Sequence, residues 1–110
     1  MNYSVIATQR FEKELKRLAK KYPFLKAEFS ILIHQMNQFP EKGVYIGNNC
    51  YKIRLAISSK GKGKSGGARV ISYVYSFKET VYLLTVYDKN EKSGLKPNEL
   101  KEMIENLVLD

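Results

Sequence analysis

The sequence predicts one α+β domain in which helices pack against a small, mostly antiparallel sheet. The main observation is the order of its periodic segments: one strand pattern, two helix patterns, three strand patterns and a last helix pattern. A length of 110 residues is sufficient for one modest hydrophobic core, and 44% hydrophobic residues argue against a disordered chain. We therefore expect residues 1–110 to form a single domain.

The first strand and the first helix are predicted near the N-terminus. Residues 2–7 (NYSVIA) form a short strand pattern, and Thr8 can cap the helix that follows. Over residues 9–22 the apolar side chains recur at helical spacing: Phe11, Leu15, Leu18 and Tyr22. Pro23 ends or redirects this helix because its ring cannot continue the hydrogen-bonding pattern.

A second helix is predicted over residues 24–38, and together the two helices should form a hairpin that covers one face of the sheet. The apolar stripe of this helix consists of Leu25, Phe29, Leu32, Ile33 and Met36. His34 lies off the stripe, and we interpret it as an ordinary surface histidine rather than a general base. Residues 40–49 (PEKGVYIGNN) are rich in turn residues and predict a loop.

The second half of the chain contains the remaining strand patterns. Residues 50–57 and 68–75 alternate between two faces, whereas residues 80–87 (TVYLLTVY) are apolar on both faces. The last of these patterns is typical of a strand inside a sheet rather than at its edge. A polar connector then leads to Pro97, a residue that favours the first turn of a final helix.

The net charge of +8 is concentrated in one interval of the chain. No acidic residue lies between Glu41 and Glu79, whereas the rest of the chain is neutral. The interval contains eight basic residues: Lys42, Lys52, Arg54, Lys60, Lys62, Lys64, Arg69 and Lys78. Such an excess is unfavourable by self-repulsion unless it meets an anion, for which a phosphate backbone is our first interpretation and an acidic protein our second.

Residue spacing excludes several chemical classes. Residues 61–67 (GKGKSGG) resemble the end of a nucleotide-binding P-loop, but position 58 is Ser where that motif needs Gly, and a strand pattern follows where a helix is needed. With one cysteine and one histidine the chain offers no zinc-ligand spacing, and nothing places Cys50 beside His34 as a nucleophile with its base. We therefore expect neither a metal nor a cofactor.

One group of cations and phenols suits phosphodiester chemistry without a metal. It comprises Lys52, Arg54, Arg69, Tyr73 and the segment 87–92 (YDKNEK). Arginine can hold a phosphate bidentately and stabilise its developing charge, and a lysine crowded by other cations has a lowered pKa. Tyrosine can stack on a base or donate a proton. Composition and spacing support this catalytic interpretation and a plain anion-binding face equally.

Two stretches, GKGKSGGARVISYVYSF and YLLTVYDKNEKSGLKPNEL, resemble the RelE/ParE superfamily of toxins from type II toxin–antitoxin systems, and most closely its HigB-like branch. Four motifs carry the resemblance: KIR at residues 52–54, GG-x-RVI-x-Y from Gly66, L-L-x-x-Y-x-K-x-E from Leu83, and L-x-P-x-E-L from Leu95. The resemblance implies a RelE-like fold, with two N-terminal helices on one face of a mostly antiparallel sheet and a C-terminal helix.

The resemblance also implies an activity. A protein of this kind would be an mRNA interferase, a ribosome-dependent and metal-independent endoribonuclease that cleaves messenger RNA in the ribosomal A site, inhibits translation and arrests growth. Arg69 takes the phosphate-stabilising place, and Lys89 matches a basic position on the active face. Lys52 and Arg54 correspond loosely to basic residues on the preceding strand. The residues expected to contact RNA are Lys60, Lys62, Lys64 and Lys92.

The sequence departs from the family pattern at one catalytic position. The RelE-type tyrosine of the last helix has no counterpart in residues 97–110, so the acid and the base stay open among Tyr73, Tyr87, Lys89 and Glu91. Two other functions stay open as well. ParE relatives inhibit DNA gyrase on the same fold without catalysis, and a plain nucleic-acid-binding module would need only the basic face.

The resemblance further implies partners and a compartment. A cognate antitoxin with a helix-turn-helix domain would bind the toxin, and operator DNA would be contacted only through that antitoxin; the other partners would be the ribosome and messenger RNA. No apolar run approaches the roughly 20 residues that span a bilayer, so no membrane contact is expected. The first residues lack the plan of a signal peptide and Cys50 has no disulfide partner, which together predict a cytoplasmic protein.

Overall fold

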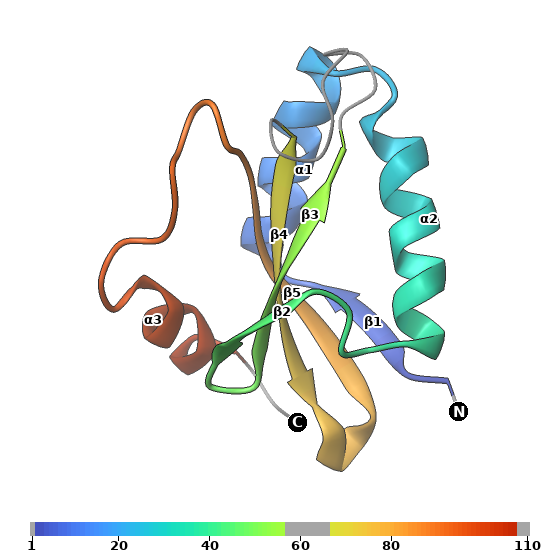
Figure 1. The fold of residues 1–110 in the computed structure, drawn as a ribbon, viewed down its shortest axis with the longest axis vertical. Coiled ribbons are helices and arrows are strands. Elements are labelled where there is room, and N and C mark those ends of the chain that lie inside the picture. Colours follow the sequence, from blue (N-terminus) through green and yellow to red (C-terminus); the bar gives the residue numbers. More distant parts are fainter. Residues whose placement is uncertain (1, 57–66, 108–110) are drawn as a thin grey trace.

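The computed structural model describes residues 2–56 and 67–107, in which three α-helices pack on a five-stranded sheet (Figure 1). In chain order the elements are β1 (Ser4–Ala7), α1 (Gln9–Lys21), α2 (Leu25–Gln38), β2 (Val44–Gly47), β3 (Cys50–Leu55), β4 (Ala68–Tyr75), the 3-10 helix η3 (Ser76–Lys78), β5 (Thr80–Asp88) and α3 (Glu99–Glu105). This architecture confirms the predicted α+β class with two N-terminal helices and a C-terminal one.

The strands lie in the order β1-β5-β4-β3-β2. β1 pairs parallel with β5, from Ser4 opposite Thr80 to Ala7 opposite Leu83, and the other pairs are antiparallel. All residues of β5 are buried. The apolar pattern of residues 80–87 predicted such an interior strand, and the structure confirms it.

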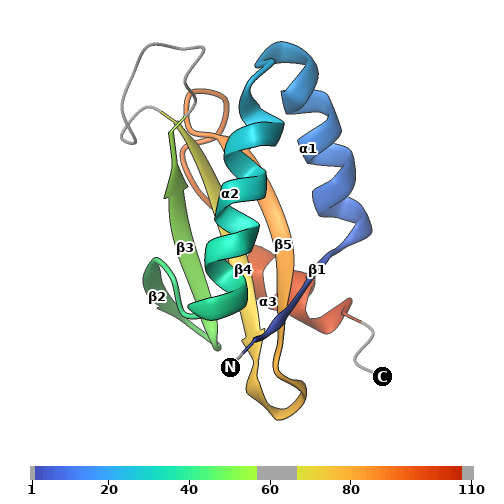
Figure 2. The ribbon, with the colours of Figure 1, turned by 90° about the vertical axis from the view of Figure 1, so that its right-hand side faces the viewer.

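α1 and α2 cover one face of the sheet (Figure 2). Their apolar side chains pack with those of β3, β4 and β5 in a core that includes Phe11, Leu18, Leu25, Phe29, Leu32, Met36, Ile53, Val70, Val81, Leu83 and Val86. α1 begins after Thr8, whose Oγ1 accepts a hydrogen bond from the Phe11 amide at 3.2 Å. Thr8 is therefore the helix cap that the sequence predicted.

α3 lies on the opposite face of the sheet from α2, as Figure 1 shows. The side chain of its residue Met103 packs in a second apolar cluster, whose other buried members are Cys50, Ile71, Tyr82, Leu84 and Tyr87. The sequence predicted this helix without placing it on a face. Its position leaves both faces of β5 covered, which explains why this strand is apolar on both sides.

Residues 40–49 do not form only the predicted loop, because Val44–Gly47 is an edge strand, β2, paired with β3. The strand is only four residues long, and residues with positive φ adjoin or end it: Gly43 (+102°), Gly47 (+93°), Asn48 (54°) and Asn49 (61°). Turn-forming residues therefore dominate the local sequence, and the strand between them is too short to show a clear alternating pattern.

Candidate functional site

Arg54, Arg69 and Tyr87 form a row across three adjacent strands. Arg54 of β3 is the register partner of Arg69 of β4, and Arg69 is the register partner of Tyr87 of β5. Paired residues have Cβ atoms about 4.5–5.5 Å apart, so the two arginines start from one small area of the sheet. The row lies on the α3 side, since Tyr87 belongs to the same apolar cluster as Met103. Because like charges placed opposite each other repel, this row favours a bound anion.

Burial differs along the row. Arg54 is exposed, whereas Arg69 is only 3% exposed and its Nη1 donates a hydrogen bond to the Ala68 carbonyl at 3.2 Å. An anion that approaches from solvent would therefore meet Arg54 first, and direct contact with Arg69 requires its surroundings to rearrange. Burial raises the pKa of the Tyr87 phenol, although the Arg69 charge acts in the opposite direction. At neutral pH Tyr87 is thus protonated and can donate a proton.

Two more predicted cations extend the row. Lys52 is two residues before Arg54 on β3, and side chains at this spacing share a face about 7 Å apart. Lys89 follows β5, and its amide donates a hydrogen bond to the Gly67 carbonyl at 3.2 Å, which holds it beside the start of β4. The Lys89 side chain is exposed and that of Lys52 is half-buried, so both are accessible to a ligand at the surface.

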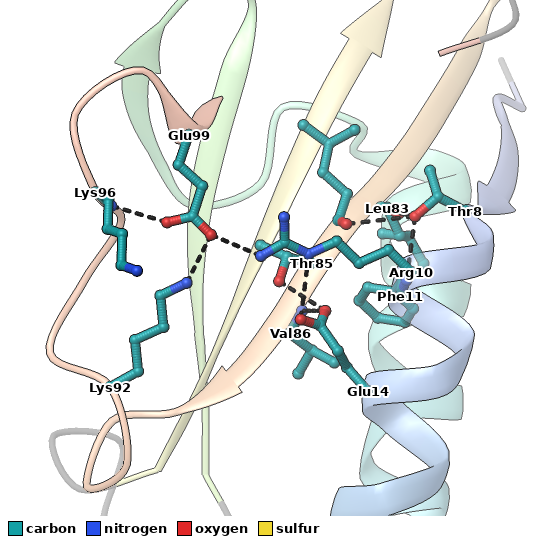
Figure 3. Close-up of polar contacts among 11 residues, drawn as sticks. Thr8, Arg10, Phe11, Glu14, Leu83, Thr85, Val86, Lys92, Lys96 and Glu99 are labelled. Atoms are coloured by element: carbon teal, nitrogen blue, oxygen red, sulfur yellow. Dashed lines mark hydrogen bonds and ion pairs between the residues drawn. The ribbon is translucent and has the colours of Figure 1, made fainter. Parts of the chain in front are cut away.

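Lys92 reaches the row from the connector between β5 and α3. Its Nζ lies 5.6 Å from the centroid of the Tyr87 ring. The same Nζ lies 2.6 Å from Oε2 of Glu99 (Figure 3). The same Oε2 accepts a hydrogen bond from Arg10 Nη2 at 2.6 Å, and Oε1 accepts one from the Lys96 amide at 2.8 Å. Lys92 was predicted to contact RNA, and in this structure a carboxylate holds it.

The environment of Glu99 fixes its charge. Burial alone would raise the pKa of this carboxyl group, but the hydrogen bonds from Lys92, Arg10 and the Lys96 amide outweigh burial and lower it to about 2. Glu99 is therefore an anion throughout the physiological pH range. It also acts on Tyr87, whose pKa its negative charge raises.

Glu91, a predicted acid or base, is directed toward α1. Its Oε1 lies 2.6 Å from Arg17 Nη2 and its Oε2 lies 3.1 Å from Lys21 Nζ. Hydrogen bonds from Arg17 and Lys21 lower the pKa of Glu91. Nearby, the Tyr22 hydroxyl donates a hydrogen bond to the buried Asp88 carboxylate at 2.7 Å. The structure therefore uses this part of the YDKNEK segment to join β5 to α1 and does not bring Glu91 into the row.

Tyr73 also lies away from the row. It is four residues after Arg69 on β4, a separation of about 13 Å along an extended strand. Its ring packs against Tyr75 and Tyr82 with centroid separations of 6.4 and 6.5 Å. The structure thus separates two tyrosines that the sequence left as equal candidates. The predicted RNA-binding residues Lys60, Lys62 and Lys64 lie outside the described residues.

Glu99 and Arg10 are the site residues that sequence reasoning missed. Glu99 is the acidic residue of the L-x-P-x-E-L motif, which marks a helix start but gives no sign of a charge partner. Arg10 is one of several charges along α1, and 89 positions separate it from Glu99 in the sequence. Only the fold brings them together.

Within residues 2–56 and 67–107, no group of three or more His, Cys, Asp or Glu residues could hold a metal ion. In the same ranges no helix combines the length and the apolar character needed to cross a bilayer. The site therefore consists of cations, one phenol and one paired carboxylate.

The sheet, its helices and the row define a small basic α+β domain with arginines in register on one face of its sheet. The family model described as the RelE toxin of the RelE/RelB toxin–antitoxin system matches residues 8–107, so the chain belongs to the RelE toxin family. The predicted membership in the RelE superfamily is thereby confirmed, whereas its HigB-like branch stays a prediction.

Solved structures have the same fold at low sequence identity. A double arginine-to-alanine mutant of the Escherichia coli toxin RelE in the free state matches with a TM-score of 0.65 and 17% identity, covering 98% of this chain and 100% of that chain. That mutant in complex with an antitoxin RelBc peptide gives 0.60 and 18%, covering 98% and 100%. A chain of the RelBE2 toxin–antitoxin complex of Mycobacterium tuberculosis gives 0.56 and 15%, covering 80% and 92%.

Proposed function

We propose that the protein is a type II toxin that cleaves messenger RNA in the ribosomal A site as a metal-independent endoribonuclease. The row of Arg54, Arg69 and Tyr87, with Lys52 and Lys89 beside it, carries the proposal. Inhibition by contact alone has no need for two arginines paired beside a protonated phenol. Membership in the RelE toxin family supports the same function.

In the proposed reaction the 2′-hydroxyl oxygen of one nucleotide attacks the adjacent phosphorus. The P–O2′ bond forms, the P–O5′ bond breaks, a base takes the proton of the 2′-hydroxyl, and the departing 5′-oxygen receives a proton. The products are a 2′,3′-cyclic phosphate, which water can open to a 3′-phosphate, and a 5′-hydroxyl. Arg54 and Arg69 would stabilise the charge that develops on the phosphate oxygens.

The geometry narrows the choice of acid and base among the predicted residues. Tyr87 is protonated at neutral pH and suits the role of proton donor to the 5′-oxygen. Tyr73 lies too far along β4, and Glu91 is paired with α1. Lys89 is thus the predicted residue that we propose to test first as the base.

We also propose that a cognate antitoxin neutralises the protein by covering the row. Two solved relatives with this fold are an RelBE2 toxin–antitoxin complex and a RelE mutant bound to an antitoxin peptide. An acidic segment would complement the cationic face electrostatically. A helix-turn-helix domain in the antitoxin, through which the pair would bind operator DNA, is part of the same proposal.

The test is expression of the wild type, Arg69→Ala and Arg54→Ala in cells without the antitoxin, followed by mapping of messenger RNA 3′ ends after brief induction. Removal of one donor to the transition-state charge should reduce cleavage by about 100-fold or more. Arg17→Ala is the matched control, since it also removes one arginine, here an exposed one on α1 whose partner Glu91 does not belong to the row. This control should cleave like the wild type.

Growth arrest of equal strength by the wild type and Arg69→Ala, with intact messenger RNA, would refute the endoribonuclease proposal. DNA damage signalling during that arrest would instead identify a contact inhibitor of DNA gyrase. Loss of cleavage in Arg17→Ala to the same degree would show that the arginine effects report folding and not chemistry.

A further inference from the structure

Glu99 joins three separate parts of the chain at the border of the candidate site (Figure 3). Its carboxylate receives Arg10 from α1, Lys92 from the connector after β5, and the Lys96 amide from the turn before α3. The Glu99 side chain is 14% exposed, so its charge is only weakly screened by water. A carboxylate in this setting can fix the positions of both cations.

The other side of this arrangement is anchored to the sheet. Arg10 Nε donates a hydrogen bond to Glu14 Oε2 at 3.2 Å. Glu14 Oε1 in turn accepts hydrogen bonds from the Thr85 hydroxyl at 2.7 Å and from the Val86 amide at 3.2 Å. A continuous chain of contacts therefore connects the edge of β5, through α1, to Glu99.

Lys92 is the last residue in this chain of contacts, and its ammonium is held by Glu99. A lysine ammonium on a four-carbon stem has many rotamers, and ordering it requires a fixed partner. Arg10 and Lys92 share one oxygen of Glu99, so without that carboxylate the charge of Arg10 would repel the ammonium. Lys92 remains 30% exposed while it is held, so a ligand can still reach it.

We propose that Glu99 is a positioning residue, which holds the Lys92 ammonium over Tyr87 so that Lys92 serves as a further cation for the substrate phosphate. This inference rests on the proposed function and adds to it a residue that contacts no substrate itself. A competing explanation is that Glu99 only attaches α3 to the body of the protein. The two explanations differ in whether the effect of Glu99 passes through Lys92.

A double-mutant cycle separates them. The variants are Glu99→Gln, which keeps the side-chain length and an acceptor for the Lys96 amide, Lys92→Gln, and the two combined. Glu102→Gln is the matched control, because Glu102 is an exposed carboxylate on the same helix. Each protein is mixed in excess with purified ribosomes that carry a defined messenger RNA. The single-turnover cleavage rate at saturation and the half-saturating toxin concentration are measured.

We expect Glu99→Gln to lower the saturating cleavage rate by about 10- to 100-fold, because a misplaced charge loses transition-state stabilisation. Its half-saturating concentration should change little. The combined variant should be no slower than Lys92→Gln alone, and Glu102→Gln should match the wild type. If the fold-reductions in cleavage rate of Glu99→Gln and Lys92→Gln multiply in the combined variant, Glu99 acts independently of Lys92 and the proposal is wrong.

A second measurement does not depend on cleavage. The ¹⁵N-labelled Lys92 ammonium should give a slowly exchanging NMR signal in the wild type and in Glu102→Gln, and that signal should disappear in Glu99→Gln. A signal that persists in Glu99→Gln overturns the positioning role, whatever the ribosome assay shows. Absence of cleavage by the wild type would instead refute the proposed function, while the NMR result still reports on the Glu99–Lys92 contact.

Discussion

At the scale of single residues, burial sets the chemical state of the α3 side of the sheet. Burial raises the pKa of the Cys50 thiol to about 12, which keeps it protonated and unreactive. Burial also raises the pKa of Tyr87, whereas three hydrogen bonds hold the pKa of Glu99 down at about 2. Two neutral groups and one anion thus occupy the same face at neutral pH.

The depressed pKa of Glu99 predicts a defined acid sensitivity. Its ordinary value is 4.5 and its value in the folded protein is about 2, so its stabilising effect is complete above pH 4.5 and is lost as the pH falls toward 2. At pH 7 we expect Glu99→Gln to lower the free energy of unfolding by about 1–2 kcal/mol, after allowance for partly exposed partners.

Urea unfolding of the wild type and Glu99→Gln at several pH values tests this. The difference in the free energy of unfolding between the two proteins should be constant from pH 7 to 5 and should vanish near pH 2. A difference that does not change with pH would mean that the carboxylate charge contributes nothing. Glu102→Gln, which removes an exposed carboxylate from the same helix, is the control for this comparison.

Sequence reasoning could place some residues of the candidate site on the fold and not others, for physical reasons. Arg69 and Lys89 stand in short motifs, and side chains on neighbouring strands can be placed by alternation alone. The position of Lys92 depends on Glu99 and Arg10, which come from different elements, and no periodicity encodes that contact. Tyr73 and Tyr87 are equivalent by type, and only strand register separates them.

At the scale of elements, α1 completes the pairing of β5 that β1 begins. β1 ends at Ala7 opposite Leu83, after which the Thr8 amide donates a hydrogen bond to the Leu83 carbonyl at 3.1 Å. Further along, Glu14 accepts a hydrogen bond from the Val86 amide. Thr8 and Glu14 therefore pair with backbone groups of β5 that β1 is too short to reach. The same helix places Arg10 beside Glu99.

The turns around β2 give a matched pair of glycines. Gly43 and Gly47 both have positive φ, at +102° and +93°, so alanine should strain the backbone at either position by about 1 kcal/mol. A Cβ on Gly43 would also lie 2.5 Å from the Lys52 carbonyl oxygen, whereas a Cβ on Gly47 meets nothing within 4 Å. We expect Gly43→Ala to lower the free energy of unfolding by about 1 kcal/mol more than Gly47→Ala does.

Chemical denaturation of both variants measures this difference directly. Equal losses of stability in Gly43→Ala and Gly47→Ala would show that the backbone around Lys52 can shift to accommodate the added methyl group.

The same glycines explain why β2 was missed, since four residues bounded by turn formers look like a loop. Strands β3, β4 and β5 were predictable because they are longer and keep a regular pattern.

At the scale of the whole molecule, several cations of α1 are held in ion pairs with carboxylates from other parts of the chain. Those of α1 that lie near Glu91 and Glu99 are neutralised by ion pairs, namely Arg10, Arg17 and Lys21. The charge interval between Glu41 and Glu79 contains no carboxylate, and three of its cations, Lys52, Arg54 and Arg69, lie in or beside the row. A surface of this kind is the one that we propose to meet RNA.

RNA binding should therefore weaken with salt in proportion to the phosphates contacted. For single-stranded RNA the logarithm of the binding constant should fall linearly with the logarithm of salt concentration, with a slope of about 0.7 per phosphate. Lys89→Ala should lower the slope by about one contact, whereas Arg17→Ala should leave it unchanged. Fluorescence anisotropy titrations between 50 and 300 mM salt, roughly the range over which such slopes are resolved, provide the measurement. A salt-independent affinity would exclude a phosphate partner.

The parallel pairing of β1 with β5 also constrains the timing of folding during synthesis. Ser4–Ala7 has no strand partner until Thr80–Leu83 has emerged, so the sheet closes late. The row requires β3, β4 and β5. Lys92, which lies beside the row, is held by Glu99, and Glu99 is synthesised later still. A nascent chain that stops short of Glu99 would lack an ordered site. A protein of this family would thus acquire its activity only after the ribosome that makes it has translated nearly all of the residues described above.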